Sequence, residues 1–291
     1  MKTSCNGNQC RRATLGNLRT PQPAYAACYE QATRGNFSPQ LLRTVSERLG
    51  LTVTPEDLFS YVAAIAASPA YTARFQRDLS TPGLRIPITA NASLFQEAVD
   101  SGRRVLWLQT FGERMSDSEN DRPEGPPRLP VGRAPFVPKD GEISAEPSEM
   151  PDTLNYDAEK HRLLIGTGYI ENVPPAVWNY EVSGKQVLVQ WFSYRKKHRE
   201  RPIIGDRRQP SPLGDIQPDH WLSEYTTELL KVLNVLALLV ELEPQQADLL
   251  DRICGGLLIS EDDLKAAGAF AVEPTPKPRR KKAPRGAALF D

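Results

Sequence analysis

The first third of the chain carries apolar residues at helical spacing. The pair Ser38–Pro39 is a typical helix start, because serine caps free backbone amides and proline tolerates the first helical position. The run ends at Gly50, a residue typical of helix ends. The apolar positions between them are Leu41, Leu42, Val45 and Leu49. The pattern predicts a helix from Ser38 to Gly50.

Three more helices are predicted before residue 112. Thr54–Pro55 repeats the serine–proline start signal, and the apolar face behind it comprises Leu58, Tyr61, Val62 and Ile65. Pro69 opens a short third helix that carries Tyr71 and Phe75. A fourth helix is predicted from Leu94 to about Leu108. Residues 36–112 are therefore expected to form the helical part of the protein.

The centre of the chain has shorter apolar runs. Residues 154–156, 162–166 and 177–182 are predicted to be strands. The segment 187–196 is ambiguous: Val187, Trp191 and Tyr194 fit a helical stripe, whereas Val187, Val189 and Trp191 fit the alternation of a strand. A helix is favoured there.

Long helical patterns return towards the C-terminus. Asp219 is predicted to cap the longest helix, which runs to about Leu242. Pro244 is predicted to open a further helix that ends at Gly255–Gly256, and Ser260 to start a final short one. The expected fold is mixed α+β, with an N-terminal helical cluster, a small strand-containing centre and long C-terminal helices. Residues 153–272 are expected to form an α/β core together with these C-terminal helices.

Three segments lack a regular pattern. Residues 1–35 are expected to be an irregular N-terminal segment. Residues 113–152 contain ten acidic and five basic residues, and eight prolines fall between 123 and 151. Proline lacks an amide donor and fixes φ, so an acidic loop or linker is predicted there. The tail 273–291 is rich in proline, lysine and arginine and is predicted to be a disordered basic end.

Composition excludes several classes of protein. The 291 residues are 40% hydrophobic and 25% charged, which is typical of a globular protein with a real core. No apolar run approaches the roughly 20 residues that span a bilayer, and the N-terminus has no apolar region typical of a secretory signal. Four scattered cysteines are consistent with a reducing cytoplasm. The three histidines are isolated, so no metal site is expected.

Catalytic motifs are not found in the sequence. Gly166–Thr167–Gly168 follows an apolar run, as a nucleotide-binding loop would, but the third glycine and the ribose-binding acid are missing. A tight turn between two strands is the better interpretation. The chain also lacks a phosphate-binding loop, a G-x-S-x-G elbow and an H-E-x-x-H helix. Catalytic residues and a bound cofactor are therefore not expected in this chain.

The distribution of charge points to a nucleic acid. Lysine plus arginine equals aspartate plus glutamate, at 36 each, yet seven basic and two acidic residues lie between 194 and 208. Such density suits phosphates, because each contact releases condensed counterions, and interleaved aromatic side chains can stack on bases. The candidate DNA-binding residues are Tyr194, Arg195, Lys196, Lys197, Arg199, Arg201, Arg207 and Arg208. The alternative is a solvated loop whose neighbours Trp191 and Phe192 belong to the core.

A set of motifs in fixed order resembles one family. In the centre these are VWNYEVSG at 177–184, WFSYRKK at 191–197 and SPLGDI at 211–216. Upstream they are TPEDLFSY at 54–61, SPAY at 68–71 and RIPI at 85–88, and downstream ELL at 228–230 and VELEPQQA at 240–247. From about residue 36 to 270 the chain resembles the C-terminal specificity region of type ISP restriction-modification enzymes. Residues 1–35 match nothing in that pattern.

The resemblance implies a function. It implies a module that reads a short asymmetric duplex sequence and presents it to an adenine-N6 methyltransferase, with double-stranded DNA as partner. S-adenosylmethionine, ATP and magnesium would belong to catalytic domains that this chain lacks, so a separate methyltransferase or translocase chain is a further expected partner. Two alternatives stay open: a docking module for a methyltransferase that reads no bases, and an inactive remnant of such an enzyme.

Overall fold

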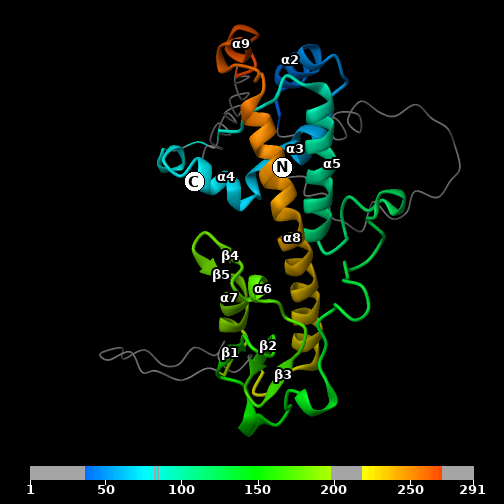
Figure 1. The fold of residues 1–291 in the computed structure, drawn as a ribbon, viewed down its shortest axis with the longest axis vertical. Coiled ribbons are helices and arrows are strands. Elements are labelled where there is room, and N and C mark those ends of the chain that lie inside the picture. Colours follow the sequence, from blue (N-terminus) through cyan, green and yellow to red (C-terminus); the bar gives the residue numbers. More distant parts are fainter. Residues whose placement is uncertain (1–36, 82, 84, 198–217, 271–291) are drawn as a thin grey trace, which may run out of the picture.

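The molecule consists of two lobes that share one long helix. The computed structural model describes residues 37–81, 83, 85–197 and 218–270. In Figure 1 the helix α8 runs through both lobes, with the helical cluster around its C-terminal half and the small sheet beside its N-terminal half. The expected mixed α+β fold, with a helical cluster, a strand-containing centre and a long C-terminal helix, is confirmed. The segments 1–35 and 273–291 lie outside the described residues.

The helices and strands have the following bounds. The α-helices are α2 Pro39–Leu49, α3 Pro55–Ala66, α4 Pro69–Arg74, α5 Ala92–Gln109, α6 Pro175–Trp178, α7 Val187–Ser193, α8 Ser223–Gly255 and α9 Glu261–Ala266. The strands are β1 Leu154–Asp157, β2 Arg162–Ile165, β3 Gly168–Ile170, β4 Glu181–Val182 and β5 Lys185–Gln186. Short 3₁₀ turns cover Asp78–Ser80, Ser118–Asn120, Lys139–Gly141 and Pro147–Glu149.

The helix starts in the upper lobe follow the sequence signals. The Ser38 hydroxyl accepts a hydrogen bond from the Leu41 amide at the start of α2. Thr54 and Asp57 form a capping box at the start of α3, in which each side chain accepts from the other residue's amide. Ser260 caps α9 in the same way as Ser38 caps α2. The first three predicted helices and the last one are therefore confirmed, as is the helix predicted over 94–108, which is α5.

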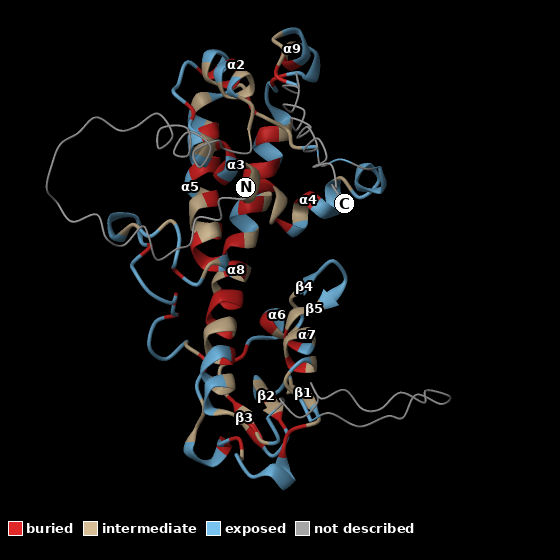
Figure 2. Cartoon of the chain, turned by 180° about the vertical axis from the view of Figure 1, so that it is seen from behind, coloured by how far each residue is buried: buried red, intermediate tan, exposed pale blue. Residues whose placement is uncertain are grey.

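Two hydrophobic cores stabilise the two lobes. The upper core is built from α2, α3, α4 and α9 and from one end each of α5 and α8. The lower core joins the other ends of α5 and α8 to the sheet, α6 and α7. In Figure 2 buried residues follow α8 through both lobes, and they also line α5. Because α5 and α8 belong to both cores, each helix couples the packing of one lobe to that of the other.

The small sheet is a meander of three antiparallel strands in the order β1–β2–β3. Ile165 pairs with Gly168, and Gly166 at φ +56° starts the two-residue turn between β2 and β3. Gly166–Thr167–Gly168 is therefore the tight turn expected from the sequence. Leu163, Ile165 and Ile170 are fully buried, so one face of the sheet packs into the lower core.

Three predicted boundaries were wrong. Residues 177–182 are not one strand: Pro175 starts the short helix α6, and only Glu181–Val182 are extended. The N-cap of α8 is Leu222, whereas the Asp219 carboxylate pairs with His220. Pro244 opens no new helix, because α8 continues through it to Gly255. A proline inside a helix removes one hydrogen bond, and here the two buried ends of α8, each in its own core, outweigh that loss.

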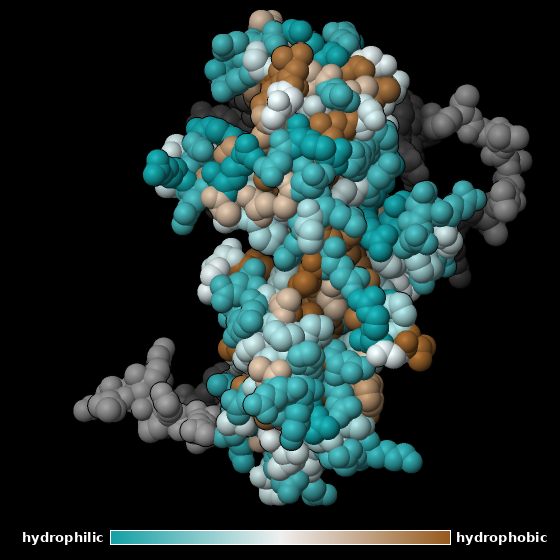
Figure 3. Space-filling model, viewed as in Figure 1, coloured by the Kyte–Doolittle hydropathy of each residue, from teal (hydrophilic) through white to brown (hydrophobic). Residues whose placement is uncertain are grey.

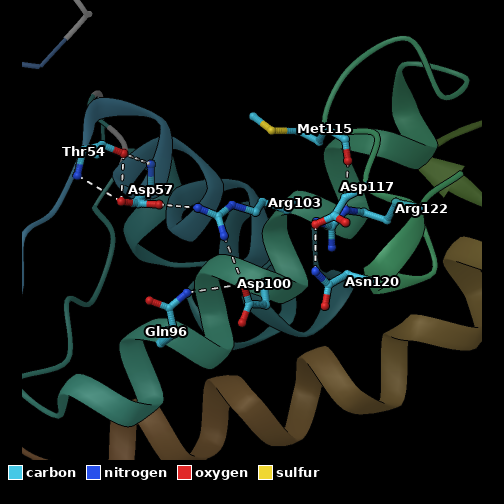
Figure 4. Close-up of polar contacts among 9 residues, drawn as sticks. All are labelled: Thr54, Asp57, Gln96, Asp100, Arg103, Met115, Asp117, Asn120 and Arg122. Carbon is cyan, nitrogen blue, oxygen red and sulfur yellow. Dashed lines mark hydrogen bonds and ion pairs between the residues drawn. The ribbon is translucent and has the colours of Figure 1, made fainter. Parts of the chain in front are cut away.

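The acidic, proline-rich segment packs against the helices without forming an α-helix or a strand. Arg122 is nearly buried and donates to the Met115 carbonyl at 2.8 Å and to the Asp117 carboxylate at 2.9 Å (Figure 4). A hydrogen bond from Asn120 lowers the pKa of Asp117, and Arg122 lowers it further. The indole of Trp107 in α5 donates to the Pro123 carbonyl at 3.0 Å. These contacts fix the start of the segment to the end of α5.

A polar bridge connects α3 and α5 in the upper lobe. Arg103 of α5 donates to Asp57 of α3 at 2.5 Å and to Asp100 at 3.2 Å, and Gln96 donates to Asp100 (Figure 4). The Asp57 carboxylate also accepts from the amide of the N-cap residue Thr54, so a single carboxylate serves the helix start and the contact between the helices.

No helix in the part of the chain that the structure describes is long and apolar enough to cross a membrane.

Candidate nucleic-acid interface

The predicted DNA-binding residues begin where α7 ends. The segment 187–196, for which a helix was favoured, contains α7 over Val187–Ser193. Tyr194, Arg195, Lys196 and Lys197 follow it directly. Arg199, Arg201, Arg207 and Arg208 lie outside the described residues. The structure therefore bears on four of the eight candidates.

Arg195 is engaged in contacts within the protein. Its guanidinium lies 4.1 Å from the ring centre of Trp191 and 5.6 Å from that of Tyr225. It forms an ion pair with Glu228 of α8 at 2.9 Å and donates to the Trp191 carbonyl at 3.2 Å. Its side chain is only 25% exposed. Arg195 thus connects α7 to α8, and both terminal nitrogens of its guanidinium already donate within the protein, whereas its buried Nε has no partner in the described part of the chain.

We expect the Arg195→Ala variant to lose about 2 kcal/mol of unfolding free energy. The substitution removes two cation–π contacts, which carry most of the loss, and the ion pair with Glu228, whose exposed carboxylate contributes less. Urea unfolding followed by tryptophan fluorescence measures the change. An Arg195→Lys variant keeps the charge but not the planar donor group, so an intermediate loss is expected. Unchanged stability together with weaker DNA binding would identify Arg195 as a free DNA contact instead.

Tyr194, Lys196 and Lys197 are exposed. Tyr194 is 70% exposed and lies outside the core. Neither lysine has an ion-pair partner among the described residues, and the Lys197 backbone amide donates to the Pro151 carbonyl at 2.7 Å. The backbone is therefore fixed while both ammonium groups face solvent. This is the arrangement that a phosphate contact requires.

An aromatic cluster connects the two sides of the segment 198–217. Trp191 and Phe192 of α7 lie before this segment, and Trp221 and Tyr225 lie after it. The ring of Trp221 lies 6.3 Å from Trp191, 6.2 Å from Phe192 and 5.4 Å from Tyr225. Phe192 is buried and Trp191 is partly buried against the lower core, as the alternative interpretation of these two residues predicted, and Trp221 is buried with them. The cluster therefore packs α7 against Trp221 and the start of α8.

A pocket of about 640 Å³ adjoins this cluster, between the end of α5, α7 and α8. Its charged lining residues are Glu113, Arg195, Glu228 and Lys231. The two acidic and two basic side chains balance, and Arg195 and Glu228 already form an ion pair, so the pocket does not favour the polyanionic backbone of DNA.

In Figure 3 apolar surface is visible at mid-height of the molecule, where Figure 1 places the centre of α8, and hydrophilic surface covers most of both lobes.

Two findings concern groups that could bind a metal or act as a nucleophile. The described residues contain no group of three or more His, Cys, Asp or Glu side chains that could hold a metal ion. Cys254 is a half-buried thiol whose pKa is raised by burial, the opposite of what an activated nucleophile needs.

The partners of Arg195 were not predicted from the sequence. Glu228 and Tyr225 lie three residues apart in α8 and therefore on one face of that helix. Their spacing is visible in the sequence, but the proximity of α7 to this face is not. Lys185, exposed in β5, was not among the candidates, because a single lysine carries no sequence signal.

Comparison with known families identifies the class of protein. The family of Type ISP C-terminal specificity domains matches residues 10–232, which is most of the chain. The chain belongs to this family. The match begins upstream of residue 36, so part of the N-terminal segment that seemed unrelated belongs to the matched region. No match was found among the curated proteins.

Two solved structures show weak overall similarity. One is a nuclease-deletion mutant of the Type ISP restriction-modification enzyme LlaGI in complex with a DNA substrate mimic, with 18% identity and a TM-score of 0.41 over 69% of this chain. The other is the DrdV–DNA complex, with 17% identity and a TM-score of 0.43 over 74% of this chain. The present chain spans 14% and 19% of the lengths of those chains.

Proposed function

We propose that this chain is the DNA-recognition module of a Type ISP restriction-modification system. It would bind double-stranded DNA in the cytoplasm and select a short sequence. The observation that carries the proposal is the family match over residues 10–232 to a specificity domain. The exposed lysines after α7 support it, because their ammonium groups are unpaired among the described residues and accessible to phosphates.

The chemistry would lie outside this chain. We infer that an adenine-N6 methyltransferase, and the associated translocase and nuclease, act on the DNA that this module holds. S-adenosylmethionine, ATP and magnesium would bind to those parts. A methyltransferase has to take its target base out of the duplex, so a module that fixes the position of the duplex would contribute to the reaction without a catalytic residue of its own.

The Lys196→Ala/Lys197→Ala double variant tests the proposal. Each lysine that neutralises a phosphate contributes about 0.9 to the slope of log affinity against log salt. We expect the affinity for duplex DNA near 0.1 M salt to fall by about tenfold per lysine, and the slope to decrease by about 1.8 in total. Fluorescence anisotropy over a salt series measures both quantities.

The matched control is the Lys139→Ala/Lys160→Ala double variant, which removes two exposed lysines elsewhere on the surface. It should bind DNA as the unsubstituted chain does. Equal losses in both double variants would show a diffuse charge effect rather than an interface. Retained DNA binding in the Lys196/Lys197 variant would favour a docking role for this surface.

A further inference from the structure

The two short strands β4 and β5 form a tight hairpin between α6 and α7. Glu181 pairs with Gln186, and Val182 with Lys185. The two residues between the strands, Ser183 and Gly184, have φ values of +53° and +72°. Positive φ at both central positions is the turn type that suits the twist of a two-residue hairpin.

The base of the hairpin is fixed and its tip is free. The Val187 amide donates to the Tyr180 carbonyl at 3.0 Å, and the Gln186 side chain donates to the Trp178 carbonyl at 2.8 Å. In contrast, all residues from 181 to 185 are exposed, and Val182 is 56% exposed. Figure 1 shows the hairpin projecting from the lower lobe next to α7. The tip adds little to the core, so its defined shape is available for a partner.

The charge around the hairpin suits a polyanion. Lys185 at the tip, and Lys196 and Lys197 at the far end of α7, have no ion-pair partner among the described residues. Glu181 is the one acidic residue of the hairpin. The seven residues of α7 separate the two groups of lysines by about 10 Å, since a helix rises 1.5 Å per residue.

We propose, on the basis of the proposed function, that the β4–β5 hairpin enters the major groove of the bound duplex. The major groove is about 12 Å wide and 8.5 Å deep and admits a two-stranded ribbon, whereas the minor groove, at about 6 Å, does so only when the duplex is deformed. A hairpin with two paired residues per strand projects about 7–10 Å. Lys196 and Lys197, about 10 Å away, then lie on the phosphates that border the groove.

The tip residues have chemistry suited to base edges in that groove. Val182 can contact the methyl group of thymine, and Lys185 can donate to the guanine acceptors. Glu181 can accept a hydrogen bond from the cytosine amino group. That specific contact would offset the repulsion between its carboxylate and the DNA phosphates. Glu181 precedes Val182 in β4, so their side chains point to opposite faces of the ribbon.

The first arm of the test compares two charge reversals in the full chain. Both Lys185 and Lys160 are exposed next to turns, and neither has an ion-pair partner among the described residues. Lys160 lies between β1 and β2. Affinity for a short duplex of random sequence is measured by anisotropy at low salt. We expect Lys185→Glu, combined with Val182→Ser, to weaken binding at least tenfold, and Lys160→Glu to weaken it less than twofold.

The second arm identifies the groove. The duplex is first loaded with methyl green, which occupies the major groove, or with distamycin, which occupies the minor groove. Methyl green should block binding of the unsubstituted chain and distamycin should not. Equal effects of the two charge reversals, or a block by distamycin alone, would overturn the hairpin proposal while leaving DNA binding intact. If the unsubstituted chain bound no duplex, the proposed function itself would fall, and the hairpin proposal with it.

Discussion

The Gly102→Ala variant is expected to lose about 3 kcal/mol or more of unfolding free energy, although alanine is the better helix former. Gly102 lies within α5, where α5 crosses α3. A Cβ atom at this position would lie 2.5 Å from the carbonyl carbon of Ser60 and 3.1 Å from its Cα, and closer still to its carbonyl oxygen. Backbone cannot move aside as a side chain can, so the two helices must separate. Overpacking of this kind outweighs the roughly 1 kcal/mol that helix propensity returns.

Ser101→Ala is the matched control for Gly102→Ala. Ser101 is the preceding residue of α5, partly exposed, and its side chain makes no hydrogen bond within the described structure. We expect the unfolding free energy of the Ser101→Ala variant to stay within about 0.5 kcal/mol of that of the unsubstituted protein. Urea unfolding followed by circular dichroism measures both variants. A Gly102→Ala variant as stable as Ser101→Ala would mean that α3 and α5 do not approach as closely as the structure places them.

The consequences of a Gly102 substitution should extend beyond the upper lobe. Phe95 and Val99 of α5 belong to the upper core, whereas Val105 and Leu108 belong to the lower one. A shift of α5 at Gly102 therefore disturbs both cores. We expect a single cooperative unfolding transition for the described lobes, displaced as a whole in the variant.

Capping signals in the sequence predicted helix starts correctly where the packing of the folded protein favours a start at the same residue. Ser38, Thr54 and Ser260 cap helices as expected. Asp219 and Pro244 gave equally good signals and were misleading. A cap contributes about 1 kcal/mol. Burial of an apolar side chain contributes more, and α8 has buried residues on both sides of Pro244. The sequence window around a proline contains no information about which cores lie at either end.

At the candidate site, the sequence likewise shows where basic residues cluster but not how each one is paired. The density of lysine and arginine after Tyr194 was evident from the sequence, and Lys196 and Lys197 are indeed exposed. Arg195 has the same side-chain chemistry as a phosphate contact, yet it pairs with Glu228, which lies 33 positions further along the chain. Whether a basic side chain is available to a ligand depends on such distant partners. Sequence alone therefore locates the basic cluster but does not show which of its cations are already paired within the protein.

The Trp221→Ala variant is expected to lose about 4 kcal/mol of unfolding free energy and to weaken DNA binding as well. Trp221 is 2% exposed, and its indole nitrogen donates to the Thr226 hydroxyl at 2.9 Å. Its ring contacts Trp191 and Phe192 of α7 and Tyr225 of α8, so its removal opens a large cavity within this cluster. The end of α7 would then be held less firmly, and Lys196 and Lys197, which follow it, would have to be ordered on binding at an entropic cost.

Two further variants separate the loss of stability from the loss of binding. Trp221→Phe keeps an aromatic ring in the cluster, so it should fold and retain most of the DNA affinity. Trp178→Ala removes a tryptophan that packs on the same core and stacks on Tyr156 at 5.5 Å, outside the aromatic cluster of Trp221. It should lower the unfolding free energy without changing the DNA affinity of the folded protein. If Trp178→Ala and Trp221→Ala weakened DNA binding equally at matched folded fractions, binding would follow the overall stability of the lobe. The aromatic cluster would then have no separate role in positioning Lys196 and Lys197.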